Sequence, residues 1–223
     1  MIKICEVAYR KPGMSVEDFQ AHWLGTHGPI VARIPGIRRY AQCHPKLAGY
    51  RNGELICDGI AEIWVDDKEA LRAMSQTAEF AAAKQDEPNF IDGNRLVELL
   101  TTESVIKDGP VPKNGVKSIS LLPFKTGMDP AVCQAHWREK HGPIAAEIET
   151  LRRYVQCHVL LGAYRKAKPP AFDGIPMAWF DNIADMRLSG ASDPYARTKA
   201  DEVNFLEPGR IGTILTQEHV IVG

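Results

Sequence analysis

Residues 20–30 read QAHWLGTHGPI, and residues 134–144 read QAHWREKHGPI. Each copy carries two histidines, one tryptophan and a Gly-Pro step, and the copies begin 134 − 20 = 114 residues apart. Self-similarity of this kind marks a repeat architecture. Any account of the chain has to explain this His-Trp and His-Gly-Pro cassette and its duplication.

The match between the two halves extends well beyond the cassette. Residues 38–44 (RRYAQCH) match residues 152–158 (RRYVQCH) at the same offset. One inserted residue then raises the offset to 115, so residues 86–90 (DEPNF) fall on 201–205 (DEVNF). The sequence therefore predicts two tandem domains, residues 1–107 and 116–223, joined by a linker at 108–115 that is rich in turn-forming residues.

Each half has the periodicity of a small α+β domain. Strands are expected at 2–9, 37–44, 60–65 and 95–106. Helices are expected from about residue 16 to Gly25 and at 28–34, 66–74 and 77–87, with Ser15 and Asp129 as the N-caps of the first helix in each half. This order is the ferredoxin-like βαββαβ unit. Its two helices cover only one face of its sheet, so the other face needs a partner, which a tandem copy supplies.

Composition and charge narrow the class of protein. Lys and Arg total 27 against 28 for Asp and Glu, which gives no electrostatic case for binding nucleic acid or an anionic membrane. The N-terminus lacks the apolar core of a signal peptide, and no apolar run approaches the roughly 18 residues of a membrane span. Five cysteines without a CxxC motif favour free thiols in a reducing compartment. The cytoplasm is the expected location.

The residues that repeat resemble those of the EthD family, which belongs to the dimeric α/β-barrel superfamily. The resemblance rests on Phe19, His22-Trp23, His27-Gly28-Pro29, Arg39-Tyr40, His44, residues 86–92 and the closing Glu-x-Val-Ile, and it runs through nearly the whole chain twice. It implies two ferredoxin-like units packed sheet to sheet as an intramolecular barrel. Relatives in the superfamily include cofactor-free cyclases, dehydratases, decarboxylases and lactone isomerases, quinone-forming monooxygenases and haem proteins. The first EthD protein is an accessory protein of ether degradation.

His27 and His141 are the first candidates for catalysis. Each follows an expected helix end and precedes Gly-Pro, so a break in the backbone rather than helix periodicity fixes its place. A neutral imidazole near pH 7 suits general acid–base work. The alternative is a histidine that caps the helix by bonding its terminal carbonyls.

A second candidate group lies on the second strand, where Tyr40, Gln42 and His44 share one face. The equivalent residues of the second half are Tyr154, Gln156 and His158. Such a face looks too polar to pack on helices, so we expect it to line either the interior of the barrel or a wet pocket. A Tyr and His pair could polarise a carbonyl and move a proton without a cofactor.

Two carboxylates distinguish the halves. Glu6 and Glu62 are expected on the face of Tyr40, whereas Ser120 and Met177 replace them in the second half. Paired carboxyls on a half-buried face would raise each other's pKa and form an acid–base site. The alternative is that they bond across the barrel to Arg or Lys. If only one half is active, the first is favoured.

The remaining candidates have supporting roles. The expected substrate-binding residues are Trp23, Gln42, Trp64, Trp137 and Gln156. Trp23 and Trp137 lie on an apolar helical stripe and are expected in the core, as pocket walls at most. His22 and His136 are expected to be structural. The arginines of the repeat, Arg38, Arg39, Arg152 and Arg153, are expected to pair with the Asp-Glu before the last strand.

The sequence gives little support for a bound metal ion or cofactor. His27, His44 and Glu62 could form a three-ligand site, but no ligand spacing demands it, and no Walker or GxGxxG motif occurs. We therefore expect neither metal nor cofactor. Nucleophilic catalysis by Cys43 or Cys157 is not expected, because alternation assigns both to the helix-packed face, where a thiol stays protonated.

The combined expectation is a cofactor-independent lyase or isomerase, of dehydratase, cyclase or decarboxylase type. It would act on a small aromatic or polyketide-like carbonyl compound by His and Tyr acid–base catalysis. Two alternatives stay open: a non-catalytic accessory or small-molecule-binding protein, and a quinone-forming or haem-linked monooxygenase. Further pairing of two such chains into a homodimer also stays open.

Overall fold

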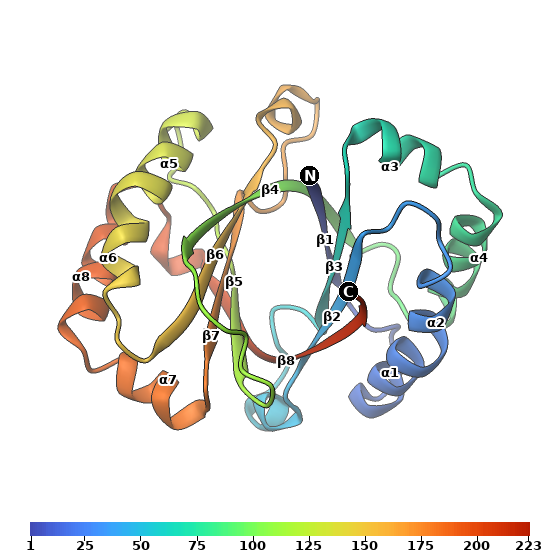
Figure 1. Ribbon diagram of the computed structural model, residues 1–223, viewed down its shortest axis with the longest axis horizontal. Coiled ribbons are helices and arrows are strands. Elements are labelled where there is room, and N and C mark those ends of the chain that lie inside the picture. The colour runs from blue at the N-terminus through green and yellow to red at the C-terminus, as the bar shows by residue number, and fades with distance from the viewer. The chain divides into compact units, whose positions relative to one another are not determined.

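The computed structural model describes all residues from Met1 to Gly223, and both repeats have the same order of elements (Figure 1). The strands are β1 (Ile2–Ala8), β2 (Arg39–Pro45), β3 (Gly59–Val65), β4 (Val97–Lys107), β5 (Val116–Leu121), β6 (Leu151–Val159), β7 (Gly174–Phe180) and β8 (Gly212–Val222). The α-helices are α1 (Val16–His22), α2 (Gly28–Val31), α3 (Lys68–Met74), α4 (Ala78–Asp86), α5 (Pro130–His136), α6 (Gly142–Ala146), α7 (Ile183–Ser189) and α8 (Asp193–Asp201). The predicted linker joins β4 to β5.

Hydrogen-bonded strands follow the order β1-β3-β2-β8-β5-β7-β6-β4 and close into an eight-stranded barrel. Each repeat therefore has the ferredoxin-like order, β4-β1-β3-β2 in the first and β8-β5-β7-β6 in the second. The pairs β1·β3 and β5·β7 are antiparallel, which confirms that the first and third strands of each repeat are neighbours. The predicted α+β fold is thus confirmed.

The chain forms two compact units, Met1–Leu100 with Glu218–Gly223 and Thr101–Gln217. The last strand of each repeat is divided between them. β4 begins in the first unit and pairs with β6 in the second, and β8 pairs with β5 in the second unit and ends in the first. His219, near the end of β8, therefore belongs with the side chains of the first repeat.

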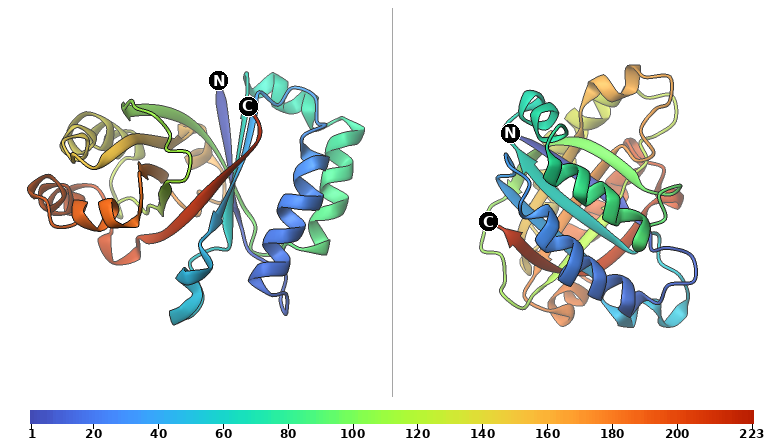
Figure 2. Two further views of the ribbon diagram at one scale, coloured as in Figure 1. Left: turned by 60° about the horizontal axis from the view of Figure 1, so that its bottom comes forward. Right: turned by 90° about the vertical axis from the view of Figure 1, so that its right-hand side faces the viewer.

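Within each unit the helices lie along one face of the strands. Figure 2 shows α1, α2 and α4 stacked along one face of β1–β3. Between these layers lie aromatic rings: Phe19 is 5.4 Å from Trp23 and 5.6 Å from Phe90, centroid to centroid. Trp137 and Phe205 are buried in the equivalent core of the second unit. No helix of the chain is long and apolar enough to cross a lipid bilayer.

The predicted helix starts are confirmed. The Ser15 side chain accepts a hydrogen bond from the Asp18 amide, and the Asp129 side chain accepts one from the Ala131 amide. Pro130 occupies the first position of α5, where a missing N–H costs nothing. The two repeats thus start the same helix by different chemistry.

The predicted end of the first helix at Gly25 is wrong. The chain stays helical through a π-helical turn, Trp23–His27, and continues directly into α2. The Gly28 amide donates to the Trp23 carbonyl, the i to i−5 bond of a π turn, and the second repeat has the same turn at Trp137–His141. Pro29 lies in the first turn of α2, so it does not break the helix. His27 is therefore held inside a helix rather than after one.

Three predictions about the faces of the sheet are also wrong. In the register of β1 and β3, Cys5 is opposite Glu62 and Glu6 is opposite Ala61. Residues directly opposite each other share a face, so Glu6 and Glu62 point to opposite faces and cannot form the expected carboxylate pair. Cys43 shares the face of Glu62 and donates its S–H to Oε1 of that carboxylate at 2.8 Å, so it is not on the helix-packed face.

Conversely, the polar side chains of β2 do face the helices. Gln42 Nε2 donates to the carbonyl oxygen of Trp23 at 2.9 Å, and the His44 ring stacks on the Trp23 indole at 4.6 Å. Gly28 allows this approach, because a Cβ there would lie 3.2 Å from Gln42 Nε2. The face was expected to avoid helices because it is polar, but a helix carbonyl supplies the partner that it needs.

The arginines of the repeat do not pair with the Asp-Glu before the last strand. Arg38 bonds Asp66 and Arg152 bonds Asp181, because the start of β2 or β6 runs beside the residues that follow β3 or β7. Of the other two, Arg39 bonds Glu218 at 2.9 Å and Arg153 bonds Asp108. The carboxylate of Asp86 is thus left for other partners.

Candidate active site

A cavity of about 220 Å³ lies within the first unit, between the strands β1 and β3 and the helices α2, α3 and α4. About half of the residues that line it are aliphatic, and Phe80 is its one phenyl ring. The polar and charged residues that line it are Glu6, His27, Arg72, Ser75, Lys84, Glu87 and Glu98. An apolar cavity with a few converging ionisable groups is the usual form of a small-molecule site.

His27 lines this cavity and is held by a carboxylate behind it. Its Nδ1 lies 3.0 Å from Oδ2 of Asp86, which assigns the proton to Nδ1 and leaves Nε2 with a free lone pair. Burial lowers the pKa of His27 and outweighs the opposing hydrogen bond and charge of Asp86. The ring is therefore neutral at pH 7 and can accept a proton.

Asp86 is a candidate site residue that the sequence analysis did not select. It accepts hydrogen bonds from His22 Nε2 at 3.0 Å, from His27 Nδ1 and from Asn89 Nδ2 at 3.1 Å. Burial alone would raise the pKa of Asp86, but these three donors hold it below its usual value. The repeated stretches DEPNF and DEVNF contain this aspartate, but in the sequence analysis their acidic residues were interpreted as partners of the arginines.

Glu6 is the second ionisable group with a displaced pKa. Its side chain is half-buried because it faces the cavity, and burial raises its pKa to about 7. The charges of Glu98 and Glu87 act in the same direction, and that of Lys84 opposes them. Lys84 Nζ itself lies 2.7 Å from Oε1 of Glu87. Near neutral pH a substantial fraction of Glu6 is therefore protonated and can donate.

The structure places the Tyr-Gln-His group of β2 outside this cavity. Gln42 Nε2 donates to the Tyr40 hydroxyl at 2.8 Å, and His44 Nε2 donates to Gln42 Oε1 at 2.9 Å. Burial raises the pKa of Tyr40 well above its usual value and lowers that of His44 to about 3. The three side chains form a closed chain of hydrogen bonds in the core.

The second repeat has an equivalent chain, but the buried Nδ1 of His158 has no hydrogen-bond partner. Gln156 Nε2 donates to the Trp137 carbonyl at 2.9 Å, and His158 Nε2 donates to Gln156 Oε1 at 3.0 Å. Burial raises the pKa of Tyr154 to about 12 and lowers that of His158 to about 4. His44, His158 and the tyrosines do not line the cavity beside His27, so they are not placed to act on a molecule bound there.

The predicted tryptophans are core residues. Trp23 is 2% exposed and Trp137 is fully buried. Each indole packs on a glycine of the neighbouring strand: a Cβ on Gly59 would lie 2.3 Å from the Trp23 ring. Trp64 lies on the opposite face, with Lys3 Nζ 4.5 Å from its ring centre.

Glu62 is separated from the histidines with which it was expected to bind a metal. It lies on the face turned away from the helices, where its Oε2 is 2.5 Å from Lys3 Nζ and both side chains are 1% exposed. Nowhere in the chain do three or more His, Cys, Asp or Glu side chains gather closely enough to hold a metal ion. The combination of His27, His44 and Glu62 is therefore not assembled.

The second repeat keeps the histidine–aspartate arrangement but not the acid. His141 Nδ1 lies 3.0 Å from Asp201 Oδ2, and His136 Nε2 lies 3.0 Å from the same carboxylate. At the position of Glu6, however, Ser120 pairs in register with Thr213, and the two hydroxyls are 2.7 Å apart. Thr213 stands where the first repeat has Glu98, at the offset of 115.

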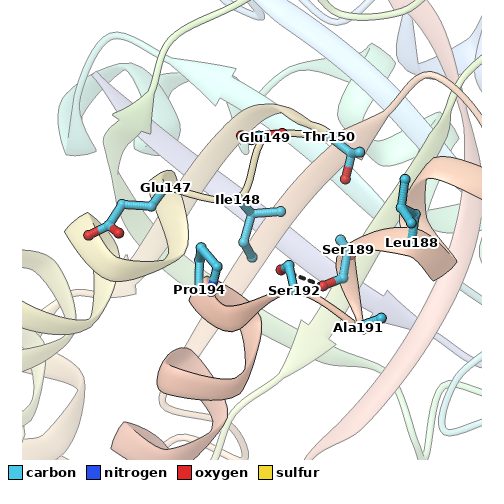
Figure 3. Close-up of a pocket in the computed structure, with 9 residues that line it drawn as sticks. All are labelled: Glu147, Ile148, Glu149, Thr150, Leu188, Ser189, Ala191, Ser192 and Pro194. Atoms are coloured by element: carbon cyan, nitrogen blue, oxygen red, sulfur yellow. Dashed lines mark hydrogen bonds between the residues drawn. The ribbon is translucent and has the colours of Figure 1, made fainter.

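A different pocket, of about 400 Å³, is present in the second repeat (Figure 3). It lies between the loop after α6 and the turn that joins α7 to α8. Ile148 and Ser189 line it, and these are the equivalents of Ile34 and Met74 in the first cavity. No histidine lines this pocket, so it lacks the imidazole that the first cavity has.

Comparisons with known proteins bear on the fold and the family. An anthrone oxidase-like protein aligns with 100% of this chain and 93% of its own, with a TM-score of 0.68 and 8% identity. A chlorite dismutase variant from Candidatus Nitrospira defluvii aligns with 97% of this chain and 91% of its own, with a TM-score of 0.55 and 9% identity. At such identities the likeness shows the fold alone.

Three further results concern the family. An ethyl tert-butyl ether d (EthD) family protein from Bacillus halodurans C-125 shares 28% identity over 47% of this chain and 99% of its own, with a TM-score of 0.39. No curated protein matches the chain. The model of the EthD domain matches twice, over residues 11–94 and 125–209, which is most of both repeats. The chain therefore belongs to the EthD domain family and carries two copies of the domain in tandem.

Proposed function

We propose that this protein is a cofactor-independent isomerase or lyase that moves a proton on a small carbonyl compound in the cavity of the first repeat. One observation carries the proposal. His27, held by Asp86, and Glu6, whose pKa is raised to about 7, line the same cavity of about 220 Å³. Two groups whose environments displace their pKa values in opposite directions are the usual acid and base of such sites.

The chemistry follows from the protonation states. His27 Nε2 takes a proton from the carbon next to the carbonyl, and the Asp86 carboxylate stabilises the imidazolium that forms. Glu6 gives its proton to the carbonyl oxygen, so the carbonyl becomes an enol. An isomerisation is completed when His27 returns its proton to another carbon and the enol O–H proton goes back to Glu6. In an elimination, the enol expels a leaving group from the next carbon, the leaving group takes the proton of His27, and the enol O–H proton goes back to Glu6. Each such group contributes about 10²- to 10⁴-fold to the rate.

The size of the cavity restricts the substrate. A dry cavity of about 150 Å³ holds one benzene molecule. The cavity here, about 220 Å³, therefore suits a single substituted ring or a branched compound of similar size. A polycyclic polyketide would not fit in it.

The second repeat is proposed to be a structural partner. It has His141 and Asp201 but Ser120 in place of Glu6, so it can accept a proton but has no matching donor at that position. The divergence of the two repeats supports one active cavity in each chain.

An exchange assay tests the function. Single-ring ketones and aldehydes are incubated with the protein in D₂O, and deuterium entry next to the carbonyl is followed by NMR. We expect exchange that depends on the protein, with a rate at least about 100-fold lower in Glu6→Gln. Compounds that bind without any exchange would instead favour an accessory or binding role, and exchange that Glu6→Gln leaves unchanged would refute the assignment of the acid.

A further inference from the structure

His22 and His27 donate to one carboxylate. His22 Nε2 lies 3.0 Å from Oδ1 and 3.1 Å from Oδ2 of Asp86, and His27 Nδ1 lies 3.0 Å from the same Oδ2. Asn89 completes the set of donors on Oδ1. Oδ2 of Asp86 is therefore shared by two imidazoles, and Oδ1 by His22 and Asn89.

The π turn is what makes this sharing possible. The two histidines are five residues apart, and in an α-helix of 3.6 residues per turn they would point about 140° away from each other. The wider turn at Trp23–His27, whose bonds span five residues, brings both rings to one side of the helix. The ring of Phe90 supports them from behind, 4.8 Å from His22 and 4.9 Å from His27.

His22 does not line the cavity, so it cannot touch a substrate bound there. Its N–H occupies acceptor capacity on both oxygens of Asp86, which makes that carboxylate less basic. A less basic Asp86 stabilises the imidazolium form of His27 less, so protonated His27 releases its Nε2 proton more readily. The other charged groups near His27 are Glu87, at the end of α4, and the remaining charged residues that line the cavity, Glu6, Arg72, Lys84 and Glu98.

We propose that His22 is a positioning residue, which fixes the Asp86 carboxylate and through it sets the orientation and basicity of His27. This inference rests on the proposed role of His27 as the base. The competing explanation is a purely structural clasp between α1 and the end of α4. The second repeat offers the control, because His136, Asp201 and His141 form the same arrangement without the acid Glu6.

The test measures the protonation of His27 directly and needs no substrate. The full-length chain with ¹⁵N-labelled histidine is titrated by NMR, and the pKa of His27 is compared in wild type, His22→Leu and His22→Gln. His22→Leu removes the donor and is expected to raise the pKa of His27 by at least about half a unit. His22→Gln, which keeps an N–H at a similar reach, is expected to restore most of the wild-type value. A His27 pKa that does not change in folded His22→Leu would overturn the inference.

A control variant in the second repeat and a measurement of activity complete the experiment. His136→Leu should raise the pKa of His141 and leave that of His27 unchanged, whereas a clasp would lower stability equally in both variants and move neither pKa. If His22→Leu does not fold, His22→Gln decides the inference by itself. A His27 ring that is reoriented in this variant, or a His27 pKa that differs from the wild-type value, would then refute the inference. With an exchange substrate in hand, the acid limb of kcat/KM should follow the His27 pKa in each variant. Because the NMR titration is independent of turnover, failure of the proposed function leaves this result interpretable.

Discussion

Glu6 and Ser120 occupy equivalent positions on the first strands of the two repeats, 120 − 6 = 114 residues apart, but they meet different surroundings. Glu6 lines a cavity beside His27, and burial raises its pKa to about 7. Ser120 instead shares a hydrogen bond of 2.7 Å with Thr213. The duplication therefore kept the histidine–aspartate arrangement in both copies and the acid in one.

The stability of the protein should depend on the protonation of Glu6. Its folded pKa lies above its unfolded value, so the contribution to stability is full below about pH 4.5 and is lost as the pH rises through about 7. Glu6→Gln cannot ionise and should lack this loss. Urea denaturation should find the variant more stable than wild type at about pH 8 and closer to it at about pH 5. An identical pH dependence of stability in the two proteins would show that folding does not raise the pKa of Glu6.

The rate of catalysis should pass through a maximum with pH. Activity rises as His27 loses its proton, at a pH below the usual 6.5, and falls as Glu6 loses its proton near pH 7. Glu6→Gln should lose activity and also the alkaline limb. A profile of kcat/KM that does not fall between about pH 6 and about pH 8 would contradict the role of Glu6, and a profile without any acid limb would contradict that of His27.

Replacing Asp86 by Asn should impair His27 far more than it impairs the fold. An amide can hold the wrong tautomer of the ring, and in a serine protease triad the corresponding change costs about 10⁴-fold in kcat. We expect a loss of at least about 100-fold here, with Asp201→Asn as the matched control. The control should show a similar change in melting temperature and near wild-type turnover.

The contact between Trp23 and Gly59 should be sensitive to a single methyl group. A Cβ on Gly59 would lie 2.3 Å from the indole, so Gly59→Ala should cost about 1–3 kcal/mol by overpacking. Gly25 lies within the π turn with nothing within 4 Å of a Cβ, so Gly25→Ala should be neutral or stabilise by up to about 1 kcal/mol. Chemical denaturation of the pair separates the two cases, and equal costs would argue against the packing described.

The topology could be predicted from the sequence because periodicity and duplication both encode it. Alternation identified the strands, and Ser15 and Asp129 identified the helix starts. Alternation shows which residues of a strand share a face, but not which face turns to the helices. That choice depends on partners such as the Trp23 carbonyl, which satisfies Gln42 from a different element.

Part of the candidate site could be selected from the sequence, and the rest could not for physical reasons. His27 was identified from its place beside Gly-Pro, although the backbone there is a π turn rather than a break. A π turn differs from an α turn by one residue and leaves little trace in composition. Glu62 was wrongly paired with Glu6, because only the register of β1 and β3 reveals that the two lie on opposite faces.

Deuterium exchange on one single-ring ketone, compared between His27→Gln and His141→Gln, tests the central claim most directly. The two histidines have equivalent bonds to aspartate, so the variants disturb the fold in the same way. The account predicts that His27→Gln loses at least about 100-fold in exchange rate and that His141→Gln retains nearly all of it. Equal losses in the two variants, or no loss in either, would contradict a single acid–base cavity in the first repeat.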